Sequence, residues 1–351
     1  MKTPVCLRLL YFVFATGLAF GTAGCAPKVL DVGVPPYGTS SGGSGGSSVT
    51  CTGTCYVDPT GSDTTGDGSS GNPFQTITFA LSIASAGATV QVNPGTYQAP
   101  SETFPLQVPA NVILEGDVPN SGQGSTPTEI TGTALIVPSV IDAANGTPAE
   151  ATVVLGSGST IEGFYIVGVS PTPGDSGELI AIIYPVANVN VLSNFLQGAN
   201  ASGILEQSTG SNTINSTVIL AAGFADFTSF CTASGTPICL GGVSTGDVFQ
   251  QDAFATSTSY GVVIENSGGG GVFDLGGGGV SAGANTICNN GGAGVYVNIS
   301  PAATIWLQGE GWNNATPTQN NAVSGGPWDI VDQNNVSTIN AGSPLSAGCP
   351  Y

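Results

Sequence analysis

Short apolar runs, each bounded by Gly, Asn or Ser, recur along most of this chain. From residue 151 onward they read ATVVLGS, STIEGFYIVG, NVNVLSNFL, NTINSTVIL, GDVFQQDAF, YGVVIEN, NTICNN, AGVYVNI and ATIWLQG. Runs of this length are typical of strands, and no comparable helical periodicity interrupts them, which argues against βαβ folds. We therefore expect an all-β fold built from many short strands.

The spacing of these runs contains an internal repeat. Asn194 precedes Gly203-Ile204-Leu205 by nine residues, and Asp252 precedes Gly261-Val262-Val263 by the same nine. Stacked coils whose turn loops differ in length produce such an irregular repeat. The pattern predicts a right-handed parallel β-helix, a solenoid in which Asn side chains near the bends stack from rung to rung. An antiparallel sandwich, which also has many short strands and turns, is the alternative.

The segment before these runs predicts a cap for one end of the solenoid. A strand at residues 55–57 leads into a polar loop, and a short capping helix is expected over residues 76–86, before Gly87. The residues expected on the apolar face of this helix are Ile77, Ala80, Leu81 and Ala84. A strand at Thr89–Val92 follows. Such a helix would cover the open end of the coil, where unpaired backbone would otherwise be exposed to other chains.

Residues 1–24 have the layout of an export signal, with Lys2, Arg8, a short apolar run and then small residues up to Cys25. The segment TAGC ending at Cys25 resembles the lipobox of bacterial lipoproteins, whose Cys is acylated after cleavage and anchors the chain in the membrane. Thr22 stands where that family prefers Leu, so secretion with cleavage nearby is the alternative. Ala26 favours the outer membrane or cell surface, and we expect a location in the bacterial cell envelope.

The chain divides into four parts by composition. After the signal, residues 25–50 are rich in Gly and Ser and predict a flexible tether. Residues 51–313 are expected to form the β-helix domain, and residues 314–351 a C-terminal tail packed on it. Only 7% of all residues are charged, while 40% are apolar, which is ample for a core.

Six cysteines remain once Cys6 leaves with the signal and Cys25 is acylated. In an oxidising compartment six thiols predict three disulfides, although the sequence alone leaves the pairing open. Proximity suggests Cys51 with Cys55 and Cys231 with Cys239, leaving Cys288 for Cys349. A metal site is the alternative, but it would lack His ligands and paired CxxC motifs.

Three segments carry a family resemblance. They are residues 56–97, the run FPLQVPANVILEGD at residues 104–117, and the run FDLGGG at residues 273–278. Together they resemble the family called domain of unknown function 1565, which consists of pectin-lyase-like β-helices in exported microbial proteins. The resemblance implies the fold and implies no established reaction.

The absence of cations excludes several reactions. The sequence has no His, and its three cationic residues, Lys2, Arg8 and Lys28, all precede the β-helix. Without these side chains the domain has no Ser-His-Asp or Cys-His arrangement, no P-loop Lys and no Schiff-base Lys. Polysaccharide lyases of this fold abstract a proton with Arg or Lys, so we do not expect a lyase.

Carboxylates are left as candidate catalytic groups and metal ligands. Glu115 and Asp117 would share one face of a strand, at a spacing that could serve a glycoside hydrolase. The alternative is that they belong to a turn, since Gly116 lies between them and Pro119 follows. The residues Asp58, Asp63 and Asp67 lie on a Gly-rich loop that could bind calcium, or they could cap turns of that loop.

The net charge of −19 argues against nucleic acid and anionic polysaccharide as partners and favours neutral polysaccharide or a surface protein. Trp306, Trp312 and Trp328 are candidate glycan-binding residues, although Trp312 could instead close the last rung. We expect a non-catalytic, surface-anchored lipoprotein that presents a binding face for glycan or protein. The alternatives are a carboxylate-dependent glycoside hydrolase and a structural spacer of the envelope.

Overall fold

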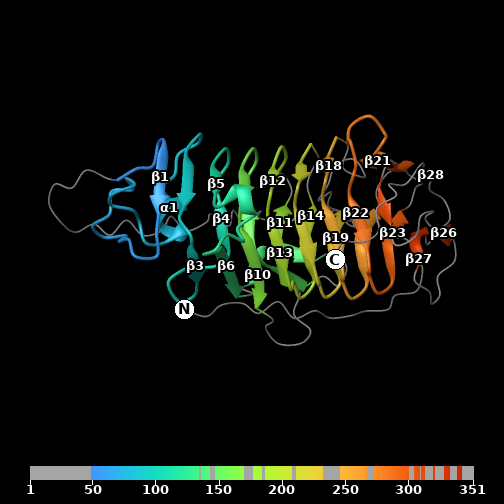
Figure 1. The fold of residues 1–351 in the computed structure, drawn as a ribbon, viewed down its shortest axis with the longest axis horizontal. Coiled ribbons are helices and arrows are strands. Elements are labelled where there is room, and N and C mark those ends of the chain that lie inside the picture. The colour runs from blue at the N-terminus through green and yellow to red at the C-terminus, as the bar shows by residue number, and fades with distance from the viewer. Residues whose placement is uncertain are drawn as a thin grey trace, which may run out of the picture. The chain divides into compact units, whose positions relative to one another are not determined.

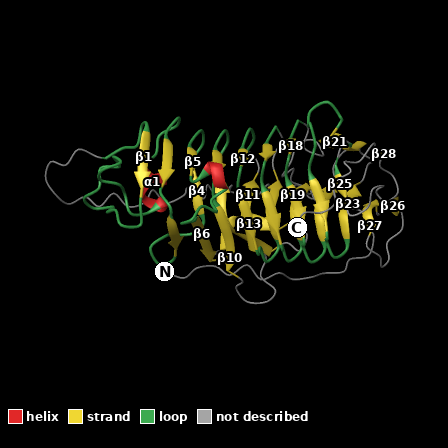
Figure 2. Cartoon of the chain, in the orientation of Figure 1, coloured by secondary structure: helices red, strands yellow, loops and turns green. Residues whose placement is uncertain are grey.

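The chain forms a parallel β-helix, in which successive turns of the chain add one strand to each of several long sheets (Figures 1 and 2). The computed structural model describes residues 49–133, 136–142, 147–169, 177–183, 186–207, 211–231, 246–266, 272–299, 304–308, 310–312, 319–320, 328–332 and 338–341. The predicted signal, Cys25 and nearly all of the tether lie outside these residues. No helix within these ranges is long and apolar enough to cross a membrane.

Three sheets run along the solenoid. In their spatial order, the seven-stranded sheet contains β1 (Thr54–Val57), β2 (Thr89–Val92), β5 (Ile113–Glu115), β9 (Thr160–Glu162), β12 (Asn190–Leu192), β15 (Thr213–Asn215) and β18 (Val248–Gln250). The eight-stranded sheet contains β3 (Gly95–Gln98), β6 (Thr128–Thr133), β10 (Tyr165–Val169), β13 (Phe195–Gln197), β16 (Val218–Leu220), β19 (Ala253–Ala255), β22 (Thr286–Cys288) and β25 (Gly311–Trp312). The ten-stranded sheet contains β4 (Leu106–Val108), β8 (Thr147–Leu155), β11 (Gly177–Ile183), β14 (Ser202–Gln207), β17 (Ala225–Cys231), β20 (Tyr260–Asn266), β23 (Ala293–Ile299), β27 (Trp328–Asp332) and β26 (Gln319–Asn320), with β7 (Ile136–Asp142) beside β8.

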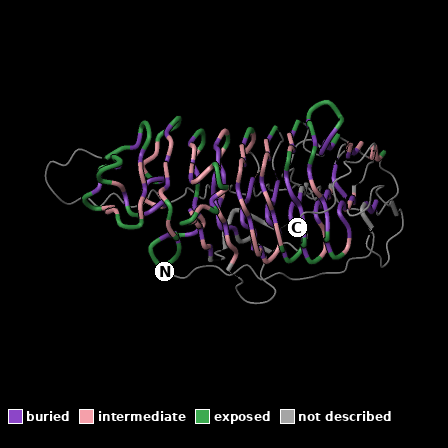
Figure 3. The backbone as a smooth tube through the Cα atoms, in the orientation of Figure 1, coloured by how far each residue is buried: buried purple, intermediate pink, exposed green. Residues whose placement is uncertain are grey.

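Strand register stacks the core in columns. In the seven-stranded sheet, Val90, Leu114, Ile161, Val191, Ile214 and Phe249 are aligned on successive rungs, and all are fully buried. Figure 3 shows such buried positions along the strands, with the exposed positions concentrated in the loops. All these rungs pair in parallel, and the antiparallel pair β7 and β8 is an addition at one sheet. The parallel β-helix is therefore confirmed, and the antiparallel sandwich is excluded.

The N-terminal cap is built largely as the sequence predicts. The helix α1 (Ile77–Ile83) buries Ile77, Ala80 and Leu81, and the Thr76 hydroxyl caps it by accepting from the Phe79 N–H at 3.0 Å. It ends three residues earlier than expected, because Ala84 is extended and bridges to Cys51. The Cys51–Cys55 disulfide is present as predicted.

Polar side chains stack at the bends between sheets. At the bend between the seven- and eight-stranded sheets, Asn194 accepts from the Phe164 N–H at 3.0 Å and donates to the Ile161 carbonyl at 3.0 Å. At the other two bends, Asn212 accepts from the Val189 N–H and Asn290 accepts from the Ser257 N–H. The predicted Asn stacking is confirmed, and it satisfies backbone groups that would otherwise be buried without partners.

The C-terminal region continues the solenoid. A three-stranded sheet contains β21 (Val272–Gly276), β24 (Thr304–Leu307) and β28 (Thr338–Asn340). Both β27 and β28 come from residues 314–351, which we expected to be a tail packed on the domain. They pair in parallel with β23 and β24 instead. The described strands of this segment thus extend two of the sheets.

Candidate functional site

The most unusual feature of the interior is its number of buried acids. Nine carboxyl groups are buried among the residues that the structure describes: Glu102, Glu178, Glu206, Asp226, Asp247, Asp252, Asp274, Glu310 and Asp332. The β-helix domain itself contains no Lys, Arg or His to neutralise them. Burial raises the pKa of Asp226 and of Asp252 well above the usual range of an Asp. Burial thus favours the neutral forms of these two acids, in a domain that has no cations to pair with them.

The predicted catalytic pair, Glu115 and Asp117, is not arranged as a pair on one strand. Glu115 ends β5, whereas Asp117 precedes the short 3₁₀ helix η1 (Val118–Asn120), where its carboxylate accepts from the Asn120 side-chain amide at 2.9 and 3.0 Å. The turn interpretation of Asp117 is the one that the structure supports. Its carboxylate orients a loop and does not line up with that of Glu115.

Glu115 has a different carboxylate neighbour. Its position on β5 is in register with Glu162 on β9, one rung further along. Burial and the negative charge of Glu115 raise the pKa of the half-buried Glu162. Neighbouring strands lie about 4.8 Å apart, so the two side chains leave the same face of the sheet one rung apart. The sequence could not reveal this pair, because its register depends on the whole coil between β5 and β9, which contains β6, β7 and β8.

The predicted metal ligands are committed to separate turns. The Asp58 carboxylate accepts from the backbone N–H and the hydroxyl of Thr60 and from the Asn93 amide. Asp63 accepts from Gln75 and Thr76 near the start of α1, and Asp67 accepts from the Ser69 N–H at 2.9 Å. Within the described ranges, no three acidic, Cys or His side chains are grouped so as to hold a metal ion. The structure thus does not bring the three Asp residues together.

This loop serves instead to cover the free edge of β1. Tyr56 donates its N–H to the Gly68 carbonyl at 2.8 Å, and the Phe74 N–H donates to the Tyr56 carbonyl at 2.9 Å. Gly61 lies so close to the Phe74 carbonyl that an added methyl group would overlap it. The glycines that suggested a calcium loop are thus needed for close packing of the loop against itself.

The three tryptophans have different positions. Trp312 is 2% exposed and fills the core at β25, so it cannot contact a glycan, and it closes a rung as the alternative prediction states. Trp306 is half-buried in β24, beside Asp274 of β21. Trp328 lies in β27, and its side chain is outside the described part of the structure.

A better candidate for a binding surface is an aromatic patch formed by Phe224, Tyr260 and Tyr296. The rings of Tyr260 and Tyr296 are stacked with centroids 4.7 Å apart, and Phe224 meets Tyr260 edge to face at 5.5 Å. Tyr296 lies between the core residues Val295 and Val297, so strand alternation places it on the outer face. Phe224 is 37% exposed. Burial, with smaller effects of Tyr260 and Glu265, raises the pKa of Tyr296 to about 12.

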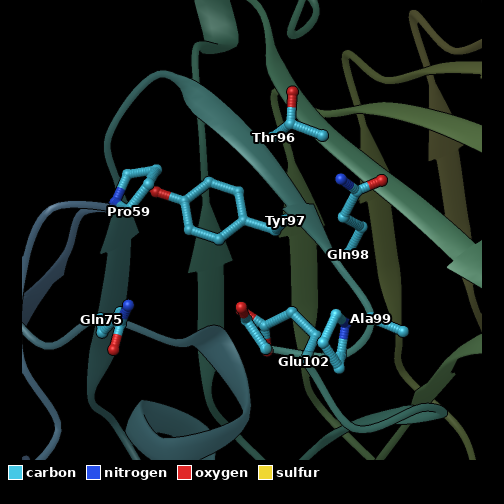
Figure 4. Close-up of a pocket in the computed structure, with 9 residues that line it drawn as sticks. Pro59, Gln75, Thr96, Tyr97, Gln98, Ala99 and Glu102 are labelled. Carbon is cyan, nitrogen blue, oxygen red and sulfur yellow. The ribbon is translucent and has the colours of Figure 1, made fainter.

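A small pocket lies at the N-terminal cap (Figure 4). It has a volume of about 150 Å³, and Figure 4 shows the Tyr97 ring between Pro59 and Glu102. The Tyr97 hydroxyl donates to the Asn93 carbonyl at 2.8 Å, and Glu102 accepts from Ile77 and Thr78 at the start of α1. The Tyr97 hydroxyl and the Glu102 carboxylate are thus already hydrogen-bonded within the protein. The exposed side-chain amide of Gln98 also lines the pocket.

The two remaining predicted disulfides involve cysteines that the structure describes only in part. Cys288 is disulfide-bonded. Its expected partner, Cys349, lies outside the described residues, as does Cys239. The pairings Cys288–Cys349 and Cys231–Cys239 therefore remain predictions.

Comparison with known proteins gives a family and several structural relatives. A family model described as "Protein of unknown function (DUF1565)" matches residues 59–319, and the sequence matches none of the curated proteins. A rhamnogalacturonan lyase is similar at 17% identity and a TM-score of 0.41, covering 82% of this chain and 86% of the lyase. The pectate lyase Pel9A is similar at 11% identity and a TM-score of 0.42, covering 86% and 80%. The deglycosylated pectin methylesterase from Aspergillus niger is similar at 12% identity and a TM-score of 0.36, covering 87% and 92%.

Proposed function

The chain belongs to the family of unknown function DUF1565, and from this premise we propose that it is a β-helix of the cell envelope that binds neutral glycan without cleaving it. The observation that carries the proposal is the aromatic patch of Phe224, Tyr260 and Tyr296 on the outside of the solenoid. Aromatic rings present flat apolar faces on which sugar rings can stack, while tyrosine hydroxyls hydrogen-bond at the edge.

The surroundings of the patch favour an uncharged ligand. Glu265 lies near Tyr296, and the Asn298 amide donates to its carboxylate at 3.5 Å. Amide and carboxylate groups can bind sugar hydroxyls. An anionic polysaccharide would meet a body with a formal charge of −19 and no cation in the β-helix domain.

Glycan-array binding followed by calorimetry tests the proposal on the whole chain. We expect Tyr260→Ala and Tyr296→Ala to weaken binding of a neutral polysaccharide at least about fivefold, since a lost stacking partner costs about 1–3 kcal/mol by analogy with base stacking. Tyr56→Ala removes a half-buried tyrosine at the opposite, N-terminal end of the solenoid and should leave binding unchanged. Equal affinities for all three variants would refute the role of the patch.

The pair of Glu115 and Glu162 favours a second candidate function, a retaining glycoside hydrolase. In such enzymes one carboxyl group acts as acid and the other as nucleophile, and the raised pKa of Glu162 suits the acid. Turnover on neutral polysaccharides, lost in both Glu115→Gln and Glu162→Gln but kept in Asp117→Asn, would support this function. Absence of turnover in the wild type would leave binding as the function.

The location of the protein at a membrane surface is part of the proposal. Acylation at Cys25 and the Gly-rich tether would hold the β-helix at a membrane surface, which suits a binding role. Mass spectrometry of the N-terminal peptide from the native host should find a lipid-modified Cys25, and Cys25→Ala should move the protein to the soluble fraction. A mature N-terminus that lies beyond residue 25 and carries no lipid would contradict the anchor. If the glycan array finds no ligand, the result would favour the role of a structural spacer.

A further inference from the structure

Glu310 is the last described member of a ladder of side chains at the bend that leads into the eight-stranded sheet. The ladder starts at the bend after the seven-stranded sheet and continues at the bend after the three-stranded sheet. In this ladder each side chain accepts a hydrogen bond from the backbone N–H of the preceding rung. The Thr217 N–H donates to Asp252 at 2.8 Å, the Asp252 N–H to Asn285 at 2.9 Å, and the Asn285 N–H to Glu310 Oε2 at 2.8 Å. Glu310 therefore connects the ladder to the end of the solenoid.

The second oxygen of Glu310 is in a different environment. Within the part of the chain that the structure describes, Oε1 is buried and has no hydrogen-bond partner. It lies against Gly276 and Gly283, where an added methyl group would collide with it. These two glycines bound the loop of residues 276–283. Glu310 thus packs directly against both ends of this loop.

The loop itself is organised by another acid. The Asp274 carboxylate accepts from the backbone N–H groups of Gly278, Val280 and Ser281 at 2.9 to 3.0 Å. This arrangement gives the run FDLGGG a structural role, because only short side chains let the loop wrap around the carboxylate. It also places a second carboxyl group near Glu310.

The groups that face Glu310 disfavour its charged form. Asp252 faces it from the bend after β18 and Asp274 from β21, while Asn285 is uncharged. Burial, together with these two acids, raises the pKa of Glu310 to about 8, although the bond from Asn285 opposes the shift. A neutral Glu310 can pack against the two glycines, whereas a carboxylate there would be buried with no donor to Oε1 and no cation among the described residues.

We propose that Glu310 is a pH-responsive latch, which in its neutral form holds the loop of residues 276–283 against the last rung and in its ionised form releases both. When the loop opens, Glu310 contacts water and ionises near its ordinary pKa of 4.5. Between that pH and about 8, the open form gives up a proton that the closed form keeps. The opening equilibrium therefore rises about tenfold per pH unit in this interval and levels off above it.

Hydrogen exchange of the whole protein, corrected for the intrinsic dependence of exchange on pH, tests the latch. The comparison is between the wild type and Glu310→Gln, which keeps an acceptor for Asn285 but cannot ionise. For residues 273–288 and 304–312 we divide the protection factor of Glu310→Gln by that of the wild type. We expect this ratio to grow about tenfold per pH unit from pH 5.5 to 7.5. Glu129→Gln, which removes a half-buried acid on β6, is the control and should follow the wild type.

A protection ratio that stays constant with pH would overturn the proposal, as would a ratio that changes equally in residues 159–197. If Glu310→Gln does not fold, the wild type alone decides. Protection of residues 273–288 must then fall with pH more steeply than that of residues 159–197, and equal slopes would overturn the latch.

Discussion

The two ends of the solenoid each bury a glutamate, and they do so in different ways. At the N-terminal end, Glu102 is 4% exposed, and both its oxygens are hydrogen-bonded, to the Ile77 N–H at 2.8 Å and to the N–H and hydroxyl of Thr78 at 2.9 and 2.6 Å. At the C-terminal end, Glu310 is fully buried. Its Oε2 accepts from the Asn285 N–H at 2.8 Å, while its Oε1 has no partner among the residues that the structure describes.

The comparison shows that the number of donors decides what a buried acid does in a domain without cations. Burial raises the pKa of both side chains, and at Glu102 the three donors oppose that effect. Glu102 therefore acts as a structural acceptor that caps α1. At Glu310 one oxygen has no donor among the described residues, which disfavours the anion, and this is the acid that we propose responds to pH.

The largest effect is expected from Glu102→Ala. It leaves the buried Ile77 N–H without its acceptor and removes two further bonds, which should lower the free energy of unfolding by about 3 kcal/mol. Chemical denaturation measures this loss, with the exposed pocket residue Gln75→Ala as control. A midpoint equal to that of the control would mean that the cap does not depend on Glu102.

A smaller loss is expected from Gly276→Ala at the other end. The added methyl group would collide with Glu310 Oε1 and the Gln308 carbonyl, which should cost about 1–3 kcal/mol. Gly53→Ala is the matched control, because its methyl group would have no atom within 4 Å. Thermal unfolding measures both variants. Equal midpoints for Gly276→Ala and Gly53→Ala would contradict the close packing of Glu310 against Gly276.

The pH dependence of stability sharpens the comparison further. A group whose pKa is raised on folding contributes stability at low pH and loses it as pH rises, so Glu310 should lower the free energy of unfolding by about 1.4 kcal/mol per pH unit between pH 5 and 8. In Glu310→Gln the slope of the free energy of unfolding against pH should be smaller by about 1.4 kcal/mol per pH unit, the contribution of one titrating group. Denaturation at pH 5, 6.5 and 8 checks it, and a wild type that is most stable at pH 8 would disprove the assignment.

The smallest effect is expected from removing divalent cations. Asp58 is half-buried and Asp67 is exposed, and both are already hydrogen-bonded, chiefly to Thr60 and to Ser69, which lower the pKa of each carboxyl. A chelator should therefore leave the thermal midpoint of the N-terminal cap unchanged. A midpoint that rises with added calcium would instead restore the metal site that the sequence suggested.

Much of the fold could be predicted from local sequence. The strand at Thr89–Val92 and the start of α1 were correctly placed, because alternation and capping depend on neighbouring residues. The Asn194 ladder could also be anticipated, since a polar residue at a bend needs a partner on the next rung. The sites were predicted less well. The pair of Glu115 with Glu162 and the aromatic patch join residues of different rungs, and the loops between rungs vary in length.

The sequence alone shows that the domain contains no cation and consists of short strands, and these two facts argue against a lyase that depends on Lys or Arg and predict a solenoid. The tertiary structure decided which acids are buried and what each one contacts. Hydrogen-bonded partners in this column of side chains are separated by 30, 35, 33 and 25 residues. Since no fixed spacing links them, only the folded register places Glu310 against Gly276 and beside Asp252.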